Sequence, residues 1–600
     1  MTVTDAPTPQ LADYRAASWS LSELLPDTRE ETLAERFAAL ERAVAGFERR
    51  RDELQAEIAP ARVLEILGEY ESIVEAAWLL SGYASLAFSA DTQSRAALAL
   101  RTRVEEHLTG LFNRVLFFTL WWRSLPEEAA ERLLPSRATH PDERHYLAEL
   151  RRFAPFTLDE RSEQLINVKD ANGVNALLTL YSMLTNRLEF RLEVAGEVRT
   201  LTRDELVRYA YDADPEVRAA AYRELYRVFA GEATVLGQLY VHRVRDWRAE
   251  NVELRGMREP ITARNLANDV PDEAVDVLLE VCRDQRGLFQ RYFRLKARWL
   301  GLERLRRYDL YAPVGGSDRE IPYGEAARLV LDTFGEFHPR FAELAERVFA
   351  EDHVDAAVRK GKRGGAMCST VLPHLTPWVL VNYTGRLRDV ATLAHELGHA
   401  VHSMMAAGHS VLTQQASLPL AETASVFGEI LVTERLLERE SDPLARRELL
   451  VKQVDDIYAT VLRQSYFVHF ERAAHEAVRA GRSTDELETL YLETLGEQFG
   501  DAVELFDDFR YEWLSIPHIY HTPFYCYAYS FGQLLVLALY RRYQREGEAF
   551  KPGYLRLLAH GGAARPEEIL GEAGIDMRDA EFWRGGFRVV EEMIEELEGL

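Results

Sequence analysis

Residues 395–399 read HELGH, a pattern whose residue types and spacing suit hydrolysis assisted by a bound metal ion. In an α-helix, His395 and His399 lie one turn apart on the same face, where both imidazoles can bind a single cation. Glu396 points to the side of that face, close enough to hold a water molecule bound to the ion. A metal acting as Lewis acid with a Glu as general base is the chemistry that this pattern predicts.

The residues around HELGH have the apolar periodicity of an amphipathic helix. Within residues 389–407, the apolar positions are Val390, Leu393, Ala394, Leu397, Val401, Met404 and Met405. Gly385 before this segment and Gly408 after it suit a helix start and stop. Gly398 costs the helix about 1 kcal/mol relative to Ala. Close approach of another backbone or of substrate would explain that cost.

A third protein ligand is expected, because catalytic zinc sites keep three protein ligands and one open position. A metzincin would have Gly at position 402 and His at position 405, but this chain has His402 and Met405, which excludes that class. We interpret His402 as a residue that supports the ligands or contacts substrate. The alternative is an ordinary packed histidine.

A second helix is predicted to begin near Pro419 and to carry two acidic residues on one face. The run LAETASVFGEILVTERLL has Glu422 and Glu429 seven residues apart, among apolar neighbours where unpaired carboxylates are costly. A metal ligand at Glu422 would remove that cost, and Glu429 would then orient a ligating His from behind. Two acids on a solvated helix edge are the alternative.

HELGHAVH followed by AETASVFGE resembles the thimet oligopeptidase-like zinc metallopeptidases, and most closely their oligoendopeptidase F branch. The resemblance implies a mainly α fold, in which two helical lobes surround a deep substrate channel and a small β-sheet lies beside the metal helix of a zincin-type core. It also implies one Zn²⁺ ion per chain, held by His395, His399 and Glu422, with Glu396 as the base. The interval from His399 to Glu422 is one or two residues shorter than the family's, which a small deletion within 408–417 would explain.

The resemblance extends upstream of HELGH, to residues 361–369 and 377–390. Trp378 to Tyr383 is a short apolar run that predicts a β-strand. An exposed edge of that strand could take up a peptide by main-chain hydrogen bonds. The alternative is an ordinary buried strand. The Gly-rich stretch before it predicts a mobile loop over the cleft.

Downstream, residues 515–535 concentrate His, Tyr and other aromatic residues, and the polar ones are His518, Tyr520, His521, Tyr525, Tyr527 and Tyr529. Such a group usually forms a core, but its phenol and imidazole donors also suit a tetrahedral oxyanion. The resembling family places a His and Tyr residues from this region against the scissile carbonyl. His518 and Tyr527 match best and Tyr520 next, while Tyr525 and Tyr529 stay open.

Charge and composition exclude several classes of protein. A net charge of −25 speaks against nucleic-acid binding, because phosphate contacts need clustered Lys and Arg. Three widely spaced cysteines favour a reducing cytoplasm over a disulfide framework. The start has no secretory signal pattern, and the apolar runs at 111–122 and 534–540 are interrupted or too short for a membrane span. Residues 1–10, rich in Thr and Pro, are expected to be disordered.

The periodicity of the chain changes near residue 190. Residues 18–185 read as successive amphipathic helices, and residues 187–207 then alternate with period two around an Ala-Gly turn. This predicts a β-hairpin, followed by a Thr202–Glu205 capping box that opens a helix. We therefore expect an N-terminal helical lobe at 1–190 and a zinc peptidase catalytic domain at 191–600.

The sequence thus predicts a zinc-dependent endopeptidase that hydrolyses internal bonds of short unstructured oligopeptides by metal-activated water. A metallo-carboxypeptidase or dipeptidyl carboxypeptidase on the same scaffold is the nearer alternative, and mapping the cleavage products would separate the two. A peptide-binding protein without catalysis is the farther alternative. No nucleic-acid or membrane partner is expected, and the oligomeric state is not determined by the sequence.

Overall fold

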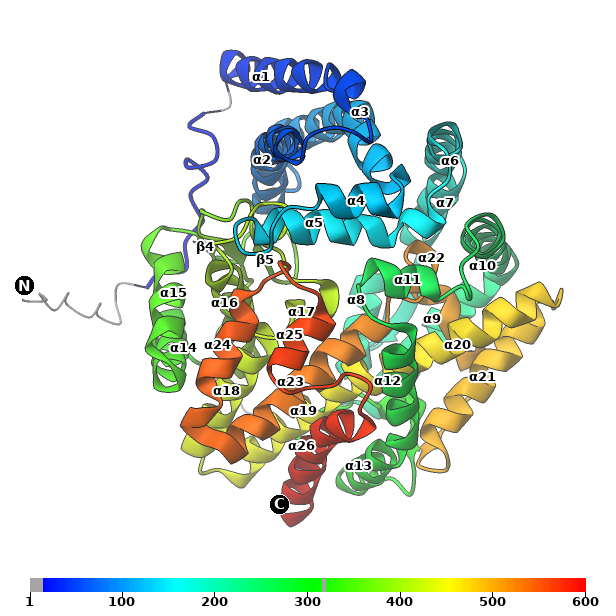
Figure 1. Ribbon diagram of the computed structural model, residues 1–600. Coiled ribbons are helices and arrows are strands. Elements are labelled where there is room, and N and C mark those ends of the chain that lie inside the picture. Colours follow the sequence, from blue (N-terminus) through cyan, green and yellow to red (C-terminus); the bar gives the residue numbers. More distant parts are fainter. Residues whose placement is uncertain (1–13, 28, 316–319) are drawn as a thin grey trace, which may run out of the picture. The chain divides into compact units, whose positions relative to one another are not determined.

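The computed structural model describes residues 14–27, 29–315 and 320–600, so the expected disorder at 1–10 lies outside the described residues. Helices dominate the described chain, and its strands form three small sheets (Figure 1). The predicted mainly α fold is confirmed, with three small sheets where one was expected. Contacts divide the chain into two compact units, each built from three separate segments.

The first unit comprises the described parts of residues 1–157, 318–439 and 542–574. Its helices are α1 (Glu30–Glu48), α2 (Pro60–Ala90), α3 (Arg95–Ser124), α4 (Glu127–Leu133), α5 (Pro141–Arg152), α14 (Tyr323–Phe337), α15 (Pro339–Ala350), α16 (Leu387–Met405), α17 (Leu418–Ala421), α18 (Ser425–Arg439), α24 (Lys551–Ala559) and α25 (Pro566–Glu572). Its strands are β4 (Val354–Asp355), β5 (Met367–Ser369) and β6 (Trp378–Leu380).

The second unit comprises the described parts of residues 158–317, 440–541 and 575–600. Its helices are α6 (Glu160–Asn172), α7 (Val174–Asn186), α8 (Arg203–Arg208), α9 (Pro215–Gly231), α10 (Ala233–Arg248), α11 (Thr262–Ala267), α12 (Asp272–Asp284), α13 (Arg286–Trp299), α19 (Pro443–Ile457), α20 (Arg463–Arg479), α21 (Thr484–Phe499), α22 (Pro517–His521), most of α23 (Tyr527–Glu546) and α26 (Ala580–Gly599). Its strands are β1 (Phe190–Val194), β2 (Glu197–Leu201), β3 (Leu305–Arg306) and β7 (Val503–Glu504).

Helices α1, α2 and α3 lie side by side and share an apolar core (Figure 1). On α1 the buried residues recur at helical spacing: Leu33, Phe37, Leu40, Val44 and Phe47. Among the described residues α2 is the one helix long and apolar enough, by length and composition alone, to pass as a membrane span. Its inward residues, including Val63, Ile66 and Leu67, pack in this core, as those of a core helix do.

A second apolar cluster joins α2 to the sheet of the first unit. Val74 and Leu86 of α2 pack with Trp378 and Leu380 of β6. A Cβ at Gly82 would lie 2.6 Å from a methyl carbon of Val371, so glycine permits this approach. The sequence predicts a division of the chain at residue 190. Contacts instead group the N-terminal helices with the HELGH helix, because these helices share this core with β6, and β6 in turn contacts α16.

The sheet beside the HELGH helix has the strand order β4–β6–β5, with β6 parallel to β4 and antiparallel to β5. The strand predicted at 378–383 is therefore β6, which is central and buried. The interpretation of that strand as an exposed edge is wrong, since both sides of β6 are paired, and the alternative of a buried strand is the one observed. The edge strand next to α16 is β5, which directly follows the Gly-rich stretch that was expected to be a loop.

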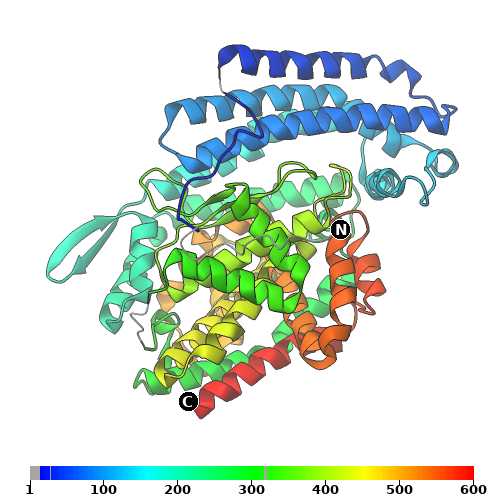
Figure 2. The ribbon, with the colours of Figure 1, turned by 90° about the vertical axis from the view of Figure 1, so that its left-hand side faces the viewer.

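The β-hairpin predicted at 187–207 is confirmed as β1 and β2 of the second unit, and Figure 2 shows it reaching out from the adjoining helices. Ala195 and Gly196 form its two-residue turn with φ of 53° and 81°, both in the left-handed region that such hairpin turns need. Thr202 and Glu205 form the predicted capping box at the start of α8. Local sequence therefore suffices for this element.

Gly398 lies where α16 crosses the start of α18. A Cβ on Gly398 would lie 2.5 Å from the Ala424 carbonyl oxygen and 2.6 Å from Ser425 Cα. From the other side, a Cβ on Gly428 would meet the Phe334 ring at 2.8 Å and the Ala394 carbonyl oxygen at 3.4 Å. Gly398 thus destabilises the helix slightly but allows the close approach of another backbone.

Gly398→Ala is expected to force this crossing apart and to lower stability by about 1–3 kcal/mol, the usual cost of overpacking. Gly110→Ala is the matched control, because Gly110 is also inside a helix but has open space around its Cβ position. That control should be neutral or stabilising by up to about 1 kcal/mol. Thermal unfolding of the purified variants measures both, and equal unfolding midpoints for the two would contradict the crossing argument.

Candidate functional site

Helix α16 presents the two histidines of HELGH, and its start is fixed by Asp389. One carboxylate oxygen of Asp389 accepts the backbone N–H groups of Thr384, at 2.7 Å, and Arg386, at 3.2 Å. From there the helix runs without interruption to Met405, so His395 and His399 lie one turn apart as predicted. Their rings lie edge to face, with centroids 4.9 Å apart.

Glu422 does not lie inside a long helix as the sequence predicted. Helix α17 ends at Ala421, residues 422–424 form a turn, and α18 begins at Ser425. Glu429 therefore belongs to α18, whereas Glu422 belongs to the turn that passes close to Gly398. The Ser425 hydroxyl donates to Glu422 Oε2 at 2.7 Å and orients that carboxylate.

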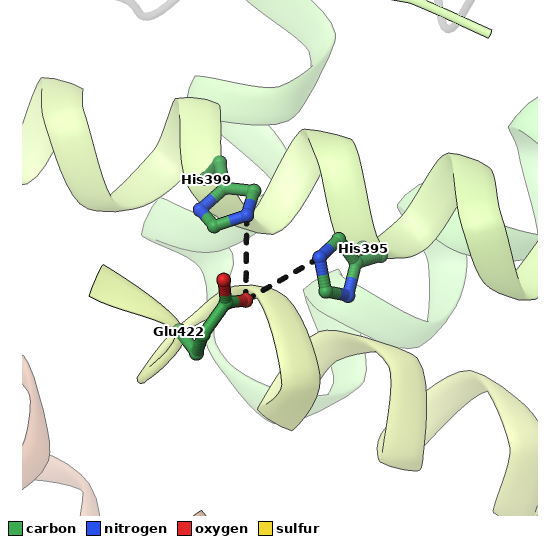
Figure 3. Close-up of side chains that lie close together, drawn as sticks. All are labelled: His395, His399 and Glu422. Atoms are coloured by element: carbon green, nitrogen blue, oxygen red, sulfur yellow. Dashed lines mark ion pairs between the residues drawn. The ribbon is translucent and has the colours of Figure 1, made fainter. Parts of the chain in front are cut away.

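The three predicted ligands converge on one point (Figure 3). Glu422 Oε2 lies 3.4 Å from His395 Nε2 and 3.4 Å from His399 Nε2. Ligand atoms about 2.0–2.1 Å from a tetrahedral zinc ion are about 3.3–3.4 Å from one another. Two imidazole nitrogens and one carboxylate oxygen at this spacing fit a zinc ion with its fourth position open.

Glu429 lies behind His395, on the side away from Glu422. Its Oε2 is 3.1 Å from His395 Nδ1, so Nδ1 donates to Glu429 and Nε2 is the nitrogen that would bind a cation after releasing its own proton. Burial opposes a charged imidazole, but the hydrogen bond and charge of Glu429, with the charges of Glu422 and Glu396, raise the pKa of His395 to about 9. The site thus attracts positive charge.

Glu396 is buried and lines a pocket of about 540 Å³ beside the histidines. Burial raises the pKa of Glu396 to about 7, although the charge of His395 opposes this. A carboxyl group with a pKa near neutrality can both accept and return a proton. The other pocket residues include Met367, Cys368 and Ser369 of the edge strand β5, and Gln414, Gln415 and Ala416 of the loop after α16.

His402 lines the same pocket and is 5% exposed. Burial lowers its pKa to about 4, with a smaller contribution from His399, so the ring is neutral. Among the three predicted ligands and His402, the first three share one centre and His402 is not part of that group. It lines the pocket, so the expected role in supporting the ligands or contacting substrate stays a prediction.

The loop that closes one wall of the pocket is tied to the N-terminal helices. His409 Nδ1 lies 2.9 Å from Asp142 of α5, and its Nε2 lies 2.8 Å from the Ala559 carbonyl oxygen. Both of these partners accept hydrogen bonds, so both ring nitrogens donate. The Ser410 hydroxyl donates to Glu71 of α2. The N-terminal helices therefore help to shape the pocket, a role that no local motif in the sequence indicates.

The Gly-rich stretch before β5 is anchored by Lys362. Its Nζ donates to the carbonyl oxygens of Asp355, Ala357 and Val381, and pairs with the Asp355 carboxylate at 2.9 Å. Burial lowers the pKa of Lys362 against the opposing effect of Asp355. These contacts hold the chain that leads into the edge strand.

A second group of metal-compatible side chains lies elsewhere in the first unit, and consists of Glu23, Glu351 and His353. His353 Nε2 is 3.9 Å from Glu23, and Glu351 already pairs with Arg347 at 2.7 Å. Its donors are more widely spaced than those at HELGH. The HELGH group is therefore the better candidate centre.

Tyr520 and Tyr527, the tyrosines that matched best, are core residues of the second unit. Tyr527 is 0% exposed, and its hydroxyl accepts the Asn268 side-chain N–H at 2.9 Å. Tyr520 is 1% exposed, and its ring stacks on Tyr181 with centroids 4.0 Å apart. In this conformation neither phenol is open to a substrate, because both are enclosed by packed side chains.

His518, by contrast, is partly exposed and lies among the two tyrosines that the sequence left open. Its Nε2 is 3.4 Å from the Tyr529 hydroxyl, and its ring is parallel to that of Tyr525 at 6.1 Å. Burial lowers the pKa of His518, and the charge of Arg463 lowers it further. Tyr525 and Tyr529 are four residues apart and share a face, whereas Tyr527, midway between them, faces the core. The four-residue spacing is the signal in the sequence that could have separated these two tyrosines from Tyr527.

Comparisons with known proteins agree with this fold. The model of peptidase family M3 matches residues 208–589. The chain is 30% identical over 415 residues to the group B oligopeptidase PepB of Streptococcus agalactiae, covering 68% of this chain and 67% of that protein. It is 25% identical over 592 residues to the oligopeptidase PepF of Bacillus subtilis, covering 97% and 87%.

Two solved structures show the same fold. A putative peptidase from Chlamydophila abortus superposes with a TM-score of 0.85 at 23% identity, covering 98% of both chains. Oligoendopeptidase-F from Enterococcus faecium gives 0.73 at 23% identity, covering 95% of this chain and 99% of that one. Fold and family match together define a peptidase.

The chain belongs to peptidase family M3, since the family model spans more than half of its length. Its relatives place it in the oligoendopeptidase F branch, as HELGHAVH and AETASVFGE had indicated.

The pair of His409 and Asp142 makes a pH-dependent contribution to stability. The hydrogen bond that His409 donates to Asp142 raises the pKa of His409 above its usual 6.5, although burial opposes this. The stabilisation is therefore complete below pH 6.5 and is lost as pH rises through the raised value. His409→Gln should lower the thermal unfolding midpoint by about 2–5 °C at pH 6, and by less at pH 9. Asp142→Asn should show the same trend, and a gap that widens with rising pH would contradict this account.

Proposed function

We propose that this chain is a zinc-dependent endopeptidase that hydrolyses internal peptide bonds of short unstructured oligopeptides. The observation that carries the proposal is the convergence of Glu422 Oε2, His395 Nε2 and His399 Nε2 beside the buried Glu396. Membership of peptidase family M3 supports the reaction class. The oligopeptidase and oligoendopeptidase names of the relatives support oligopeptides as the substrate class.

His395, His399 and Glu422 would hold one zinc ion, with Glu429 keeping the His395 ring in its ligating orientation. Bound zinc supplies Lewis acidity, which polarises the peptide carbonyl and lowers the pKa of water to about 7. Glu396 takes the proton of the attacking water and returns it to the leaving amine. Its raised pKa suits this exchange, because neither transfer is then strongly uphill.

His518 and a tyrosine would donate hydrogen bonds to the carbonyl oxygen as negative charge develops there. The structure favours Tyr529 over Tyr520 and Tyr527 for this role, because its hydroxyl lies beside His518 Nε2 while the other two phenols are enclosed. Tyr525, stacked parallel to His518, is the second candidate. We therefore propose Tyr529 in place of Tyr527 and Tyr520 as the donating tyrosine. His518 keeps its predicted role.

The pocket beside Glu396 and the edge strand β5 support binding of an extended peptide. Strand β5 is paired with β6 on one side only among the described strands, and it lines the pocket. A peptide added to that side would gain main-chain hydrogen bonds that are indifferent to its sequence. A cytoplasmic location is also proposed, on the ground of three free cysteines.

Glu396→Gln should abolish turnover and keep the metal. The amide cannot accept a proton, so hydrolysis of a quenched peptide should fall by about 10²–10⁴-fold. Zinc content, measured by atomic emission, should stay near one ion per chain, while His399→Ala should lose both zinc and activity. Near-normal turnover of Glu396→Gln with zinc bound would refute the role of Glu396 as the base. Unchanged activity after chelation would refute the requirement for a metal ion.

Tyr529→Phe should lower kcat by about 10²–10³-fold with little change in KM, because a donor to developing charge acts in the transition state. Tyr527→Phe is the matched control, and should keep kcat while losing only its hydrogen bond with Asn268. Steady-state kinetics on one internally quenched peptide compare the two. The reverse pattern would restore Tyr527 as the catalytic tyrosine.

A further inference from the structure

The loop between α22 and α23 contains a residue in an unfavourable backbone conformation. Phe524 has φ of 59°, which a bulky side chain rarely adopts, and it is 1% exposed. The loop follows α22, the helix that carries His518, and the Thr522 N–H donates to the His518 carbonyl oxygen at 2.8 Å. It then leads into Tyr525 and Tyr529, so its shape sets how these side chains lie around the His518 ring. Such a conformation persists only where surrounding groups hold it.

Glu471 of α20 is the group that holds it. Its side chain is 0% exposed, and one carboxyl oxygen, Oε1, accepts the Phe524 backbone N–H at 2.8 Å. The other oxygen, Oε2, is buried and has no hydrogen-bond partner among the described residues. Burial raises the pKa of Glu471 to about 8, against the lowering effects of the Phe524 N–H and of Arg264.

Other side chains hold the loop on either side of Phe524. Arg264 Nε donates to the Pro523 carbonyl oxygen at 3.3 Å, and the His475 ring packs on the Phe524 ring with centroids 4.6 Å apart. Arg243 Nε donates to the Tyr520 carbonyl oxygen at 3.1 Å. Glu471 is the acid among these groups, and it is the one that bonds the residue with positive φ.

A buried carboxyl group is costly, and an apolar side chain of the same volume would pack α20 without that cost. The carboxyl group makes no ion pair at contact distance among those found in the described residues. What an apolar side chain could not supply is an acceptor for the Phe524 N–H, which would otherwise be a buried unpaired donor. Position 471 therefore needs an acid or an amide because it must accept a hydrogen bond from the strained residue.

We propose that Glu471 is a positioning residue for the peptidase reaction: by holding Phe524 in its left-handed conformation, it sets Tyr525 and Tyr529 in register with His518. Glu471 itself touches none of these three side chains in the contacts described, so it acts through the loop. This inference rests on the proposed catalytic roles of His518 and Tyr529.

Two variants with side chains of similar length distinguish the effect of the hydrogen bond from the effect of packing. Glu471→Met fills a similar volume but cannot accept the Phe524 N–H, whereas Glu471→Gln keeps a carbonyl oxygen that can. Met is also suited to a buried site, so the variant is expected to fold. Glu488→Met on the neighbouring helix α21 is the matched control, because Glu488 is also a buried acid, at 8% exposed.

Glu471→Met is expected to lower kcat by about 10- to 100-fold, the scale of a misplaced catalytic group, with KM changed by less than about threefold. Glu471→Gln should keep at least about a third of wild-type kcat, and Glu488→Met should be unchanged. Hydrogen–deuterium exchange across residues 522–526 should be faster in Glu471→Met than in Glu471→Gln. All measurements use the full-length zinc-loaded enzyme.

Wild-type kcat in Glu471→Met, or a loss that Glu471→Gln shares in full, would overturn the positioning role. Failure of the proposed function gives a different result. If His518→Ala and Tyr529→Phe were both fully active while exchange at 522–526 still rose in Glu471→Met, the loop contact would stand and the catalytic roles would fall.

Discussion

The close approach of two backbones at Gly398 is the constraint on which the candidate metal centre depends. Helix α16 carries both histidines, and the turn before α18 carries Glu422. With any side chain at position 398, the turn could not come within reach, because its Ala424 and Ser425 atoms occupy the Cβ position. A residue without chemistry of its own thus brings the third ligand to the other two.

Charge is the second constraint, and it explains why this part of the molecule suits a cation. Glu396, which is buried, and the partly buried Glu422 and Glu429 are grouped around His395, and carboxylates held this close together would be destabilising on their own. A divalent cation among the ligand atoms would offset that cost, and folding and metal binding would then be coupled. Burial, with smaller contributions from the charges of Glu422 and Glu429, keeps the pKa of Glu396 near neutrality, which suits proton transfer.

The aromatic segment of the second unit shows how packing sorts chemically equivalent residues. Tyr520 and Tyr527 carry the same phenol as Tyr525 and Tyr529, but the first two fill the core. Which hydroxyl lies beside His518 depends on the phase of α23 and on the loop before it. That loop contains Phe524 at positive φ, and the backbone N–H of Phe524 donates to the buried Glu471 of α20, which lies more than fifty positions away in sequence.

The sequence by itself determined the local elements and the chemistry: the helix that presents His395 and His399, the hairpin with its Ala-Gly turn, and the family motif containing Glu422. These depend on periodicity, turn residues and short spacings, which act over a few neighbouring residues. Only the tertiary structure decided that β6 is central, that the N-terminal helices share a core with the sheet beside the HELGH helix, and that Tyr527 is enclosed. Those outcomes depend on contacts between distant segments, whose packing a local pattern does not encode.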